Sequence, residues 1–139
     1  DVAVELTTAT HAEVPRQMAR MDAGVFFIKP VFSKQASAPT KLAEFLGCGI
    51  PCLGNAGVGD MAEVLEGEGV GVVLKSFDEV AVANGLQALL QLTADPLLGT
   101  RCVAKAQKLY VSDDGVICCQ FVNTRLDFIQ DVNLAGSPC

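Results

Sequence analysis

Short apolar runs alternate with amphipathic stretches along most of this chain. The continuous apolar run 23–28 predicts a strand that is buried on both faces. The alternating residues 2–6, the brief run 51–53 and the run 71–74 predict three further strands. Four strands that alternate with helices predict an α/β protein with a parallel, doubly wound sheet, in which ligands bind beyond the carboxyl ends of the strands.

Helical spacing and helix-start residues predict the elements between and after these strands. Pro15 and Pro39 each suit the first turn of a helix, and Asp95 is a natural N-cap before Pro96. The predicted helices cover 13–21, 39–47, 60–65, two stretches after residue 78, and about 114–131. We expect one domain over residues 1–132 and a tail over 133–139.

The composition is that of a packed globule with room for one core. The chain has 139 residues, of which 50% are hydrophobic and 19% charged, and this balance excludes a disordered chain. No apolar run reaches the length of a membrane-spanning helix, so we expect no transmembrane segment. The opening residues are acidic and alternating, which is unlike a signal peptide, and a start within a strand suggests a fragment of a longer protein.

Positive charge is concentrated in one stretch of this acidic chain. The net charge is −6, which argues against a nucleic acid as the partner. From Arg16 to Lys41, however, five basic residues accompany one acid, whereas residues 42–139 contain five basic and twelve acidic residues. Such a local positive stretch suggests an anionic ligand. On charge alone, lysines that merely solvate a loop remain the alternative.

The cysteines predict neither a metal site nor a disulfide framework. Cys48 and Cys52 have no second ligand pair, and His11 is far away in the sequence. The six cysteines lie in apolar segments of a chain that is long enough to fold without disulfides. We therefore expect a reduced, cytoplasmic setting.

The helix predicted over 39–47 begins with a sequence that suits a phosphate group. A helix start offers unpaired N–H groups and about half a positive charge. Ser37 and Thr40 add hydroxyl donors, and Lys34 and Lys41 add positive charge.

Glu44 lies four residues after Thr40 on the same helix, about 6 Å further along its axis. That position suits a carboxylate that accepts hydrogen bonds from both hydroxyls of a ribose whose diphosphate sits at the helix start. On the pattern alone, a surface ion pair between Glu44 and Lys41 is the simpler interpretation.

This region also carries a resemblance to a known family. The segment Ser37-Ala-Pro-Thr-Lys-Leu-Ala-Glu-Phe-Leu-Gly-Cys-Gly-Ile-Pro51 resembles the S-P-x-K-x-x-E-(Y/F)-x-x-x-G-x-P segment of retaining glycosyltransferases with the GT-B fold, the large family 4 group. Asn55-Ala-Gly-Val-Gly-Asp60 and Glu63 follow like that family's G-x-G-D/G-x-x-E turn. The resemblance covers about residues 1–110.

The resemblance implies the C-terminal, Rossmann-like half of a GT-B fold. Such a domain binds a nucleotide-diphosphate sugar for retaining transfer of a hexosyl group to an acceptor, which a separate N-terminal domain holds. The implied roles are diphosphate binding by Ser37, Ala38, Pro39, Thr40 and Lys41, ribose binding by Glu44, and a sugar or phosphate loop containing Lys29 and Lys34. The resemblance implies no cofactor and no metal, because N–H groups and basic side chains stabilise the charge on the leaving diphosphate. It assigns no catalytic residue.

The chain departs from the family pattern at two places. Ala36 stands where many members carry a glutamate that contacts the transferred sugar. Nothing before Asp1 supplies the first strands and the Arg/Lys pair of the family's donor domain, nor the acceptor domain. We therefore predict no transferase activity for these 139 residues alone.

Three alternatives stay open on the sequence. A flavodoxin-like or receiver-like signalling domain would share the α/β pattern, although a receiver needs an aspartate at a strand end where this chain has Lys29-Pro30. A GT-B nucleotide-sugar epimerase would share the fold but would need further acid/base side chains toward the sugar. An inactive glycosyltransferase homologue is the third.

Overall fold

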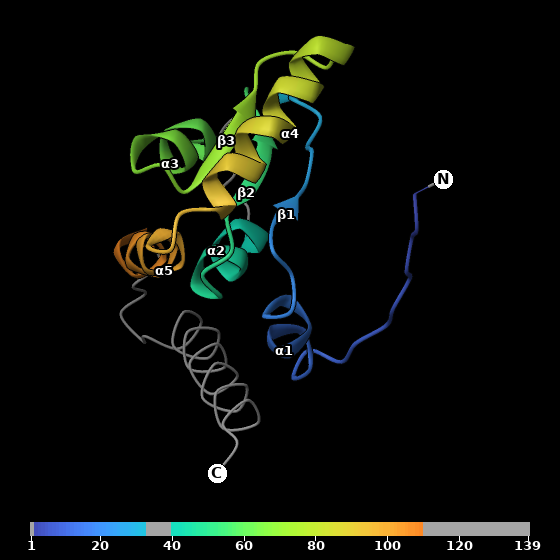
Figure 1. Ribbon diagram of the computed structural model, residues 1–139, viewed down its shortest axis with the longest axis vertical. Helices are drawn as coiled ribbons and strands as arrows, with labels where there is room; N and C mark the ends of the chain where they lie inside the picture. Colours follow the sequence, from blue (N-terminus) through green and yellow to red (C-terminus); the bar gives the residue numbers. More distant parts are fainter. Residues whose placement is uncertain (1, 33–39, 110–139) are drawn as a thin grey trace.

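The computed structural model describes residues 2–32 and 40–109 (Figure 1). In this part of the chain, three parallel strands form one sheet in the order β1 (Gly24–Val25), β2 (Cys52–Asn55) and β3 (Gly71–Leu74). The helices of the same part are α1 (Val14–Met18), α2 (Thr40–Gly47), α3 (Met61–Gly67), α4 (Glu79–Thr93) and α5 (Leu98–Leu109). The chain is thus an α/β protein with a parallel sheet, as the sequence predicted.

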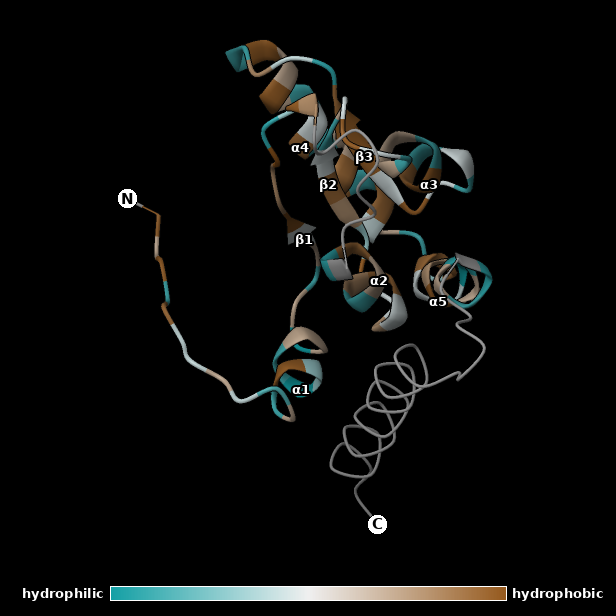
Figure 2. Ribbon diagram, turned by 180° about the vertical axis from the view of Figure 1, so that it is seen from behind, coloured by the Kyte–Doolittle hydropathy of each residue, from teal (hydrophilic) through white to brown (hydrophobic). Residues whose placement is uncertain are grey.

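Helices cover both faces of the sheet because successive residues of a strand point to opposite sides. Cys52 and Val73 belong to a core cluster that α2, α3 and α5 complete. The neighbouring residues Leu53 and Leu74 belong to a second cluster with Leu89 of α4. Figure 1 shows α3 and α4 on opposite sides of β3, and Figure 2 shows β3 in hydrophobic colours between helices of mixed colour. This arrangement is compatible with the doubly wound, Rossmann-like fold that we expected.

Two glycines allow close approach, one between neighbouring strands and one between a helix and the sheet. A Cβ on Gly71 would collide with the backbone carbonyl oxygen of Cys52, and one on Gly85 would collide with the Leu74 side chain. Gly71 therefore permits the pairing of β2 with β3, and Gly85 permits the packing of α4 on β3.

The strand predicted over residues 2–6 does not form. Val2, Val4 and Leu6 are 90%, 79% and 95% exposed. Alternation of apolar residues predicts a strand only where a neighbouring strand and a core exist to receive them, and no described strand pairs with this segment. The sheet of the described residues therefore has three strands where the sequence predicted four.

The prediction of a strand buried on both faces over 23–28 is also wrong. Only Gly24 and Val25 form a strand, and Val25 and Phe27 are 52% and 45% exposed. Among the described residues, β1 pairs with β2 on one side and has no partner on the other. Its side chains are therefore only partly covered.

The remaining predictions follow the structure closely. The strand over 71–74 is found, and the helices expected over 39–47 and 60–65 match α2 and α3 within two residues. The strand expected over 51–53 extends to Asn55, and the helix expected over 13–21 is shorter at both ends. The helix expected over 114–131 and the tail over 133–139 lie outside the described residues.

Asp95 caps the turn that leads into α5, and the helix itself begins three residues later, at Leu98. The backbone N–H of Leu97 donates to the Asp95 carboxylate at 2.9 Å. Asp78 performs the same task for α4, where the N–H of Ala81 donates to its carboxylate at 2.9 Å. None of the helices described here is long and apolar enough to cross a membrane.

Candidate functional site

The carboxyl ends of the three strands lie at one edge of the sheet, which we call the carboxyl edge. It comprises residues 29–32 after β1, 56–60 after β2 and 75–78 after β3. The helices α3 and α4 begin on this side of the sheet, whereas α2 lies beside α5, toward the end of the sheet at which β2 begins (Figure 1). In doubly wound sheets this edge is where ligands bind.

Asn55 ends β2 at this edge and is the one buried polar or charged residue in the described part of the chain, with 1% of its surface exposed. Its Oδ1 accepts the N–H of Ile28 at 2.8 Å, and its Nδ2 donates to the carbonyl of Ile28 at 2.8 Å and to that of Ala56 at 3.0 Å. A side-chain amide thus joins the end of β2 to the residues that follow β1. Sequence reasoning included Asn55 in a glycine-rich turn but gave it no role.

The turn after β2 lies against the loop after β1. Gly57 has a φ of +83°, and a Cβ at this position would lie 3.0 Å from Cβ of Pro30. Gly57 therefore provides both a left-handed backbone and the space that Pro30 needs.

An aromatic pair connects the third loop to the first. Phe27 and Phe77 form an edge-to-face contact with ring centroids 5.1 Å apart. The segment after β1 therefore contacts both the turn after β2 and the loop after β3.

Lys41 and Glu44 lie on the first turns of α2. The Lys41 ammonium is 2.6 Å from the Glu44 carboxylate, and the two side chains are 59% and 12% exposed. This is the ion pair that the spacing in the sequence allowed as the simpler interpretation. Glu44 is largely covered, whereas Lys41 projects into solvent.

The other predicted site residues are only partly placed. Lys29 is exposed and follows directly on the residue that Asn55 holds. Four further predicted site residues lie outside the described residues: Lys34, Ser37, Ala38 and Pro39. Ala36 and the side chain of Thr40 lie outside them as well.

Asp78 is an acidic side chain of the carboxyl edge, but it is engaged in structure. The Ser76 hydroxyl donates to its carboxylate, and the Ala81 N–H donates to it as well. These hydrogen bonds hold the pKa of Asp78 below its usual value. The carboxylate is therefore committed to capping α4.

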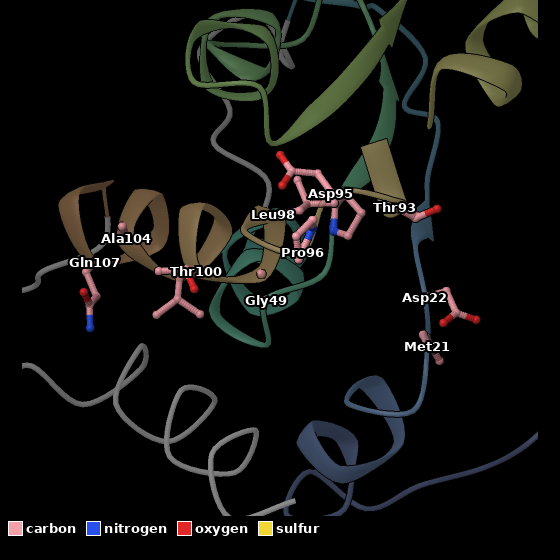
Figure 3. A pocket seen from close by; sticks show the side chains of 13 residues that line it. Met21, Asp22, Gly49, Thr93, Asp95, Pro96, Leu98, Thr100, Ala104 and Gln107 are labelled. Carbon is pink, nitrogen blue, oxygen red and sulfur yellow. The ribbon is translucent and has the colours of Figure 1, made fainter. Parts of the chain in front are cut away.

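A cavity of about 630 Å³ lies at the opposite edge of the sheet, which we call the amino edge (Figure 3). Asp22 before β1, Pro51 before β2, Thr93 at the end of α4 and one face of α5 line it. Figure 3 shows Asp22, Thr93 and Asp95 around this space. No residue that the sequence singled out as a ligand contact lines it, and none of the described lining residues is basic.

Asp95, which lines this cavity, is held by structural partners. The Arg101 guanidinium pairs with its carboxylate and also donates to the carbonyl of Gly69 at 3.2 Å. The hydrogen bond from Arg101 and that from the Leu97 N–H keep the pKa of Asp95 below its usual value. An acidic cavity without basic side chains is a poor match for a phosphate ligand.

The described cysteines are buried free thiols. Cys48, Cys52 and Cys102 form no disulfide, and burial, with a smaller effect from Cys102, raises the pKa of the Cys52 thiol. Within residues 2–32 and 40–109, no three His, Cys, Asp or Glu side chains come together in a group that could hold a metal ion.

Comparisons of the chain with models of known families, with curated proteins and with solved structures give no match. A family assignment and a function therefore rest on the motif in the sequence and on the arrangement of the carboxyl edge.

Proposed function

We propose that this chain is the donor-binding part of a retaining glycosyltransferase with a GT-B fold. In this proposal the carboxyl edge binds the nucleotide-diphosphate portion of a sugar donor, and a separate N-terminal domain holds the acceptor. The observation that carries the proposal is the position of Lys41 and Glu44, which lie one turn apart on the first turns of the helix that follows β1 in a parallel sheet. The matching of Ser37–Pro51 to the family motif supports the same assignment.

In this proposal, Lys41 binds the diphosphate of the donor and Glu44 binds its ribose. Lys41 is exposed and lies in the first turn, where the free N–H groups of the helix also point. Glu44 is one turn further on, and its carboxylate, only 12% exposed, presents acceptors beside Lys41. The ligand would draw Lys41 to the diphosphate and leave Glu44 to the ribose hydroxyls.

The ion pair between these residues is weak enough to be exchanged for a ligand. Pairs of this type at the surface contribute about 0.5 kcal/mol, whereas a hydrogen bond to a charged group contributes about 1.5–3 kcal/mol. Donor binding therefore outweighs the loss of the Lys41–Glu44 contact.

In the proposed reaction the nucleotide diphosphate leaves as the hexosyl group is transferred. Negative charge then grows on the diphosphate, and donors that already point at it lower the barrier. The start of α2, with Ser37, Thr40, Lys34 and Lys41, supplies such donors, and Lys29 enters the same loop after β1. The proposal needs no metal ion because these groups provide the positive charge.

Calorimetry with UDP, GDP and their hexose conjugates tests this function on the 139-residue chain. We expect one nucleotide to bind and Glu44→Ala to weaken its binding at least tenfold. Glu66→Ala is the matched control, because Glu66 is an exposed glutamate on α3. The proposal fails if no nucleotide binds or if the Glu44→Ala variant binds as tightly as the unmodified chain.

A further inference from the structure

Asn55 lies where β1 and β2 part from each other. Before this point the two strands are joined by backbone groups, since the N–H of Phe26 donates to the carbonyl of Leu53 at 3.1 Å. The next N–H in the series, that of Ile28, donates instead to the Asn55 side chain at 2.8 Å. A side-chain amide therefore fills the space where a backbone contact would continue a parallel ladder.

The backbone of β2 turns toward β3 at the same place. The N–H of Ala56 donates to the carbonyl of Leu74 at 2.9 Å, so β2 remains paired with β3 while it separates from the residues that follow β1. The gap between neighbouring parallel strands at their carboxyl ends is the region where ligands bind in doubly wound sheets. Asn55 sets the width of that gap.

The side-chain amide of Asn55 satisfies the neighbouring backbone groups with both its oxygen and its nitrogen. Its oxygen accepts one N–H, and its nitrogen donates to two carbonyl groups, those of Ile28 and Ala56. An aspartate could accept the Ile28 N–H but would turn an oxygen toward two carbonyl oxygens. A leucine would leave all three backbone groups without this partner in a buried position.

Two loops depend on this contact. The loop that begins at Lys29 follows Ile28 directly and leads to α2, and the turn that begins at Ala56 follows Asn55 directly. Gly57 of the turn lies against Pro30 of the loop. The two segments therefore touch at a second point, further from the strands than Asn55.

We propose that Asn55 is a positioning residue for the ligand site at the carboxyl edge. It does not touch the ligand in this proposal. It fixes the spacing between the loop that carries Lys29 and the glycine turn 56–59, and thereby the shape of the carboxyl edge. This inference rests on the proposed function and adds to it a residue outside the motif that binds the nucleotide.

The test compares Asn55→Leu with Asn84→Leu, whose asparagine is exposed on α4. Nucleotide affinity is measured by calorimetry at a temperature where urea unfolding shows both variants to be folded. We expect Asn55→Leu to bind at least tenfold more weakly and Asn84→Leu to bind as the unmodified chain does. Backbone hydrogen exchange should rise in residues 28–32 and 56–59 and stay unchanged in α4 and α5.

The positioning role would be overturned if a folded Asn55→Leu variant bound the nucleotide as tightly as the unmodified chain does. It would also be overturned if backbone hydrogen exchange rose evenly over the whole sheet. If Asn55→Leu does not fold, Gly57→Ala disturbs the same junction from the outer side, because its Cβ would press on Pro30. An unchanged affinity of that variant would likewise overturn the inference. If the unmodified chain binds no nucleotide, the proposed function fails, and the exchange pattern alone decides whether Asn55 orders the two loops.

Discussion

The two edges of the sheet differ in their charge, their contacts and the space that they enclose. The amino edge holds a cavity of about 630 Å³ whose charged lining residues, Asp22 and Asp95, are acidic. The carboxyl edge carries basic as well as acidic residues, Lys29 and Lys75 beside Asp60 and Asp78. Its loops touch through Asn55, Gly57 and an aromatic pair. The cavity thus lies at the edge whose lining suits an anionic ligand poorly.

This difference teaches that volume and ligand chemistry are separate properties of a fold. At the amino edge the polar groups serve the structure, since Asp95 caps the turn before α5 and pairs with Arg101. On α2, Lys41 and Glu44 form an ion pair with each other, and a ligand can replace that contact. We therefore propose that the ligand binds at the carboxyl edge, and the following predictions test that proposal.

The largest effect is expected from a side chain added at the amino end of β3. Gly71→Ala places a Cβ against the Cys52 carbonyl, and the strands must shift to accept it. We expect the free energy of unfolding, measured in urea, to fall by about 3 kcal/mol or more. Gly67→Ala is the control, because a Cβ there meets nothing within 4 Å, and its stability should stay within about 0.5 kcal/mol.

A smaller effect, confined to the ligand, is expected from the carboxyl edge. Lys41→Met should weaken nucleotide binding about tenfold, equal to about 1.4 kcal/mol, because a charged donor to the diphosphate is lost. The affinity should also depend less on salt concentration than that of the unmodified chain. Lys108→Met on α5 should leave the nucleotide affinity and its salt dependence unchanged. An equal loss of affinity in the two variants would show that overall charge, not the position of the lysine, governs binding.

The ion pair between Asp95 and Arg101 at the amino edge should stabilise the fold by an amount that depends on pH. The folded-state pKa of Asp95 is lowered, so its contribution is present above the unfolded value of about 3.9 and is lost as the pH falls through the folded value. Asp95→Asn should therefore have a lower Tm than the unmodified chain at pH 6, and the two curves should converge toward pH 2. A constant difference across this range would contradict the account.

The smallest effect is expected from the cavity itself. Asp22→Asn removes a charge from its lining, and we expect nucleotide affinity to change less than twofold. A larger change would place the ligand, or a part of it, at the amino edge.

The sequence predicted those elements whose signals are local. The strand 71–74 and the helix 39–47 were found because turn residues and prolines mark their ends. The Lys41–Glu44 pair follows from the i, i+3 spacing. The strands over 2–6 and 23–28 were overestimated because an apolar pattern does not reveal whether a neighbouring strand is there to pair with it.

Contacts between distant segments were beyond the reach of the sequence. Asn55 and Ile28 are 27 positions apart, and only the parallel pairing of β1 with β2 brings them together. The cavity at the amino edge likewise depends on how α5 returns to the ends of β1 and β2. The acidic lining of that cavity follows from the same packing and has no signature in the order of residues.

The most direct test of the central claim is to map the nucleotide on the folded chain by NMR. On titration with UDP or GDP, we predict amide shift changes in residues 40–44, 29–32 and 56–60, with residues 93–100 unaffected. Shift changes centred on Asp22 and on residues 93–100 would contradict the assignment of the ligand to the carboxyl edge.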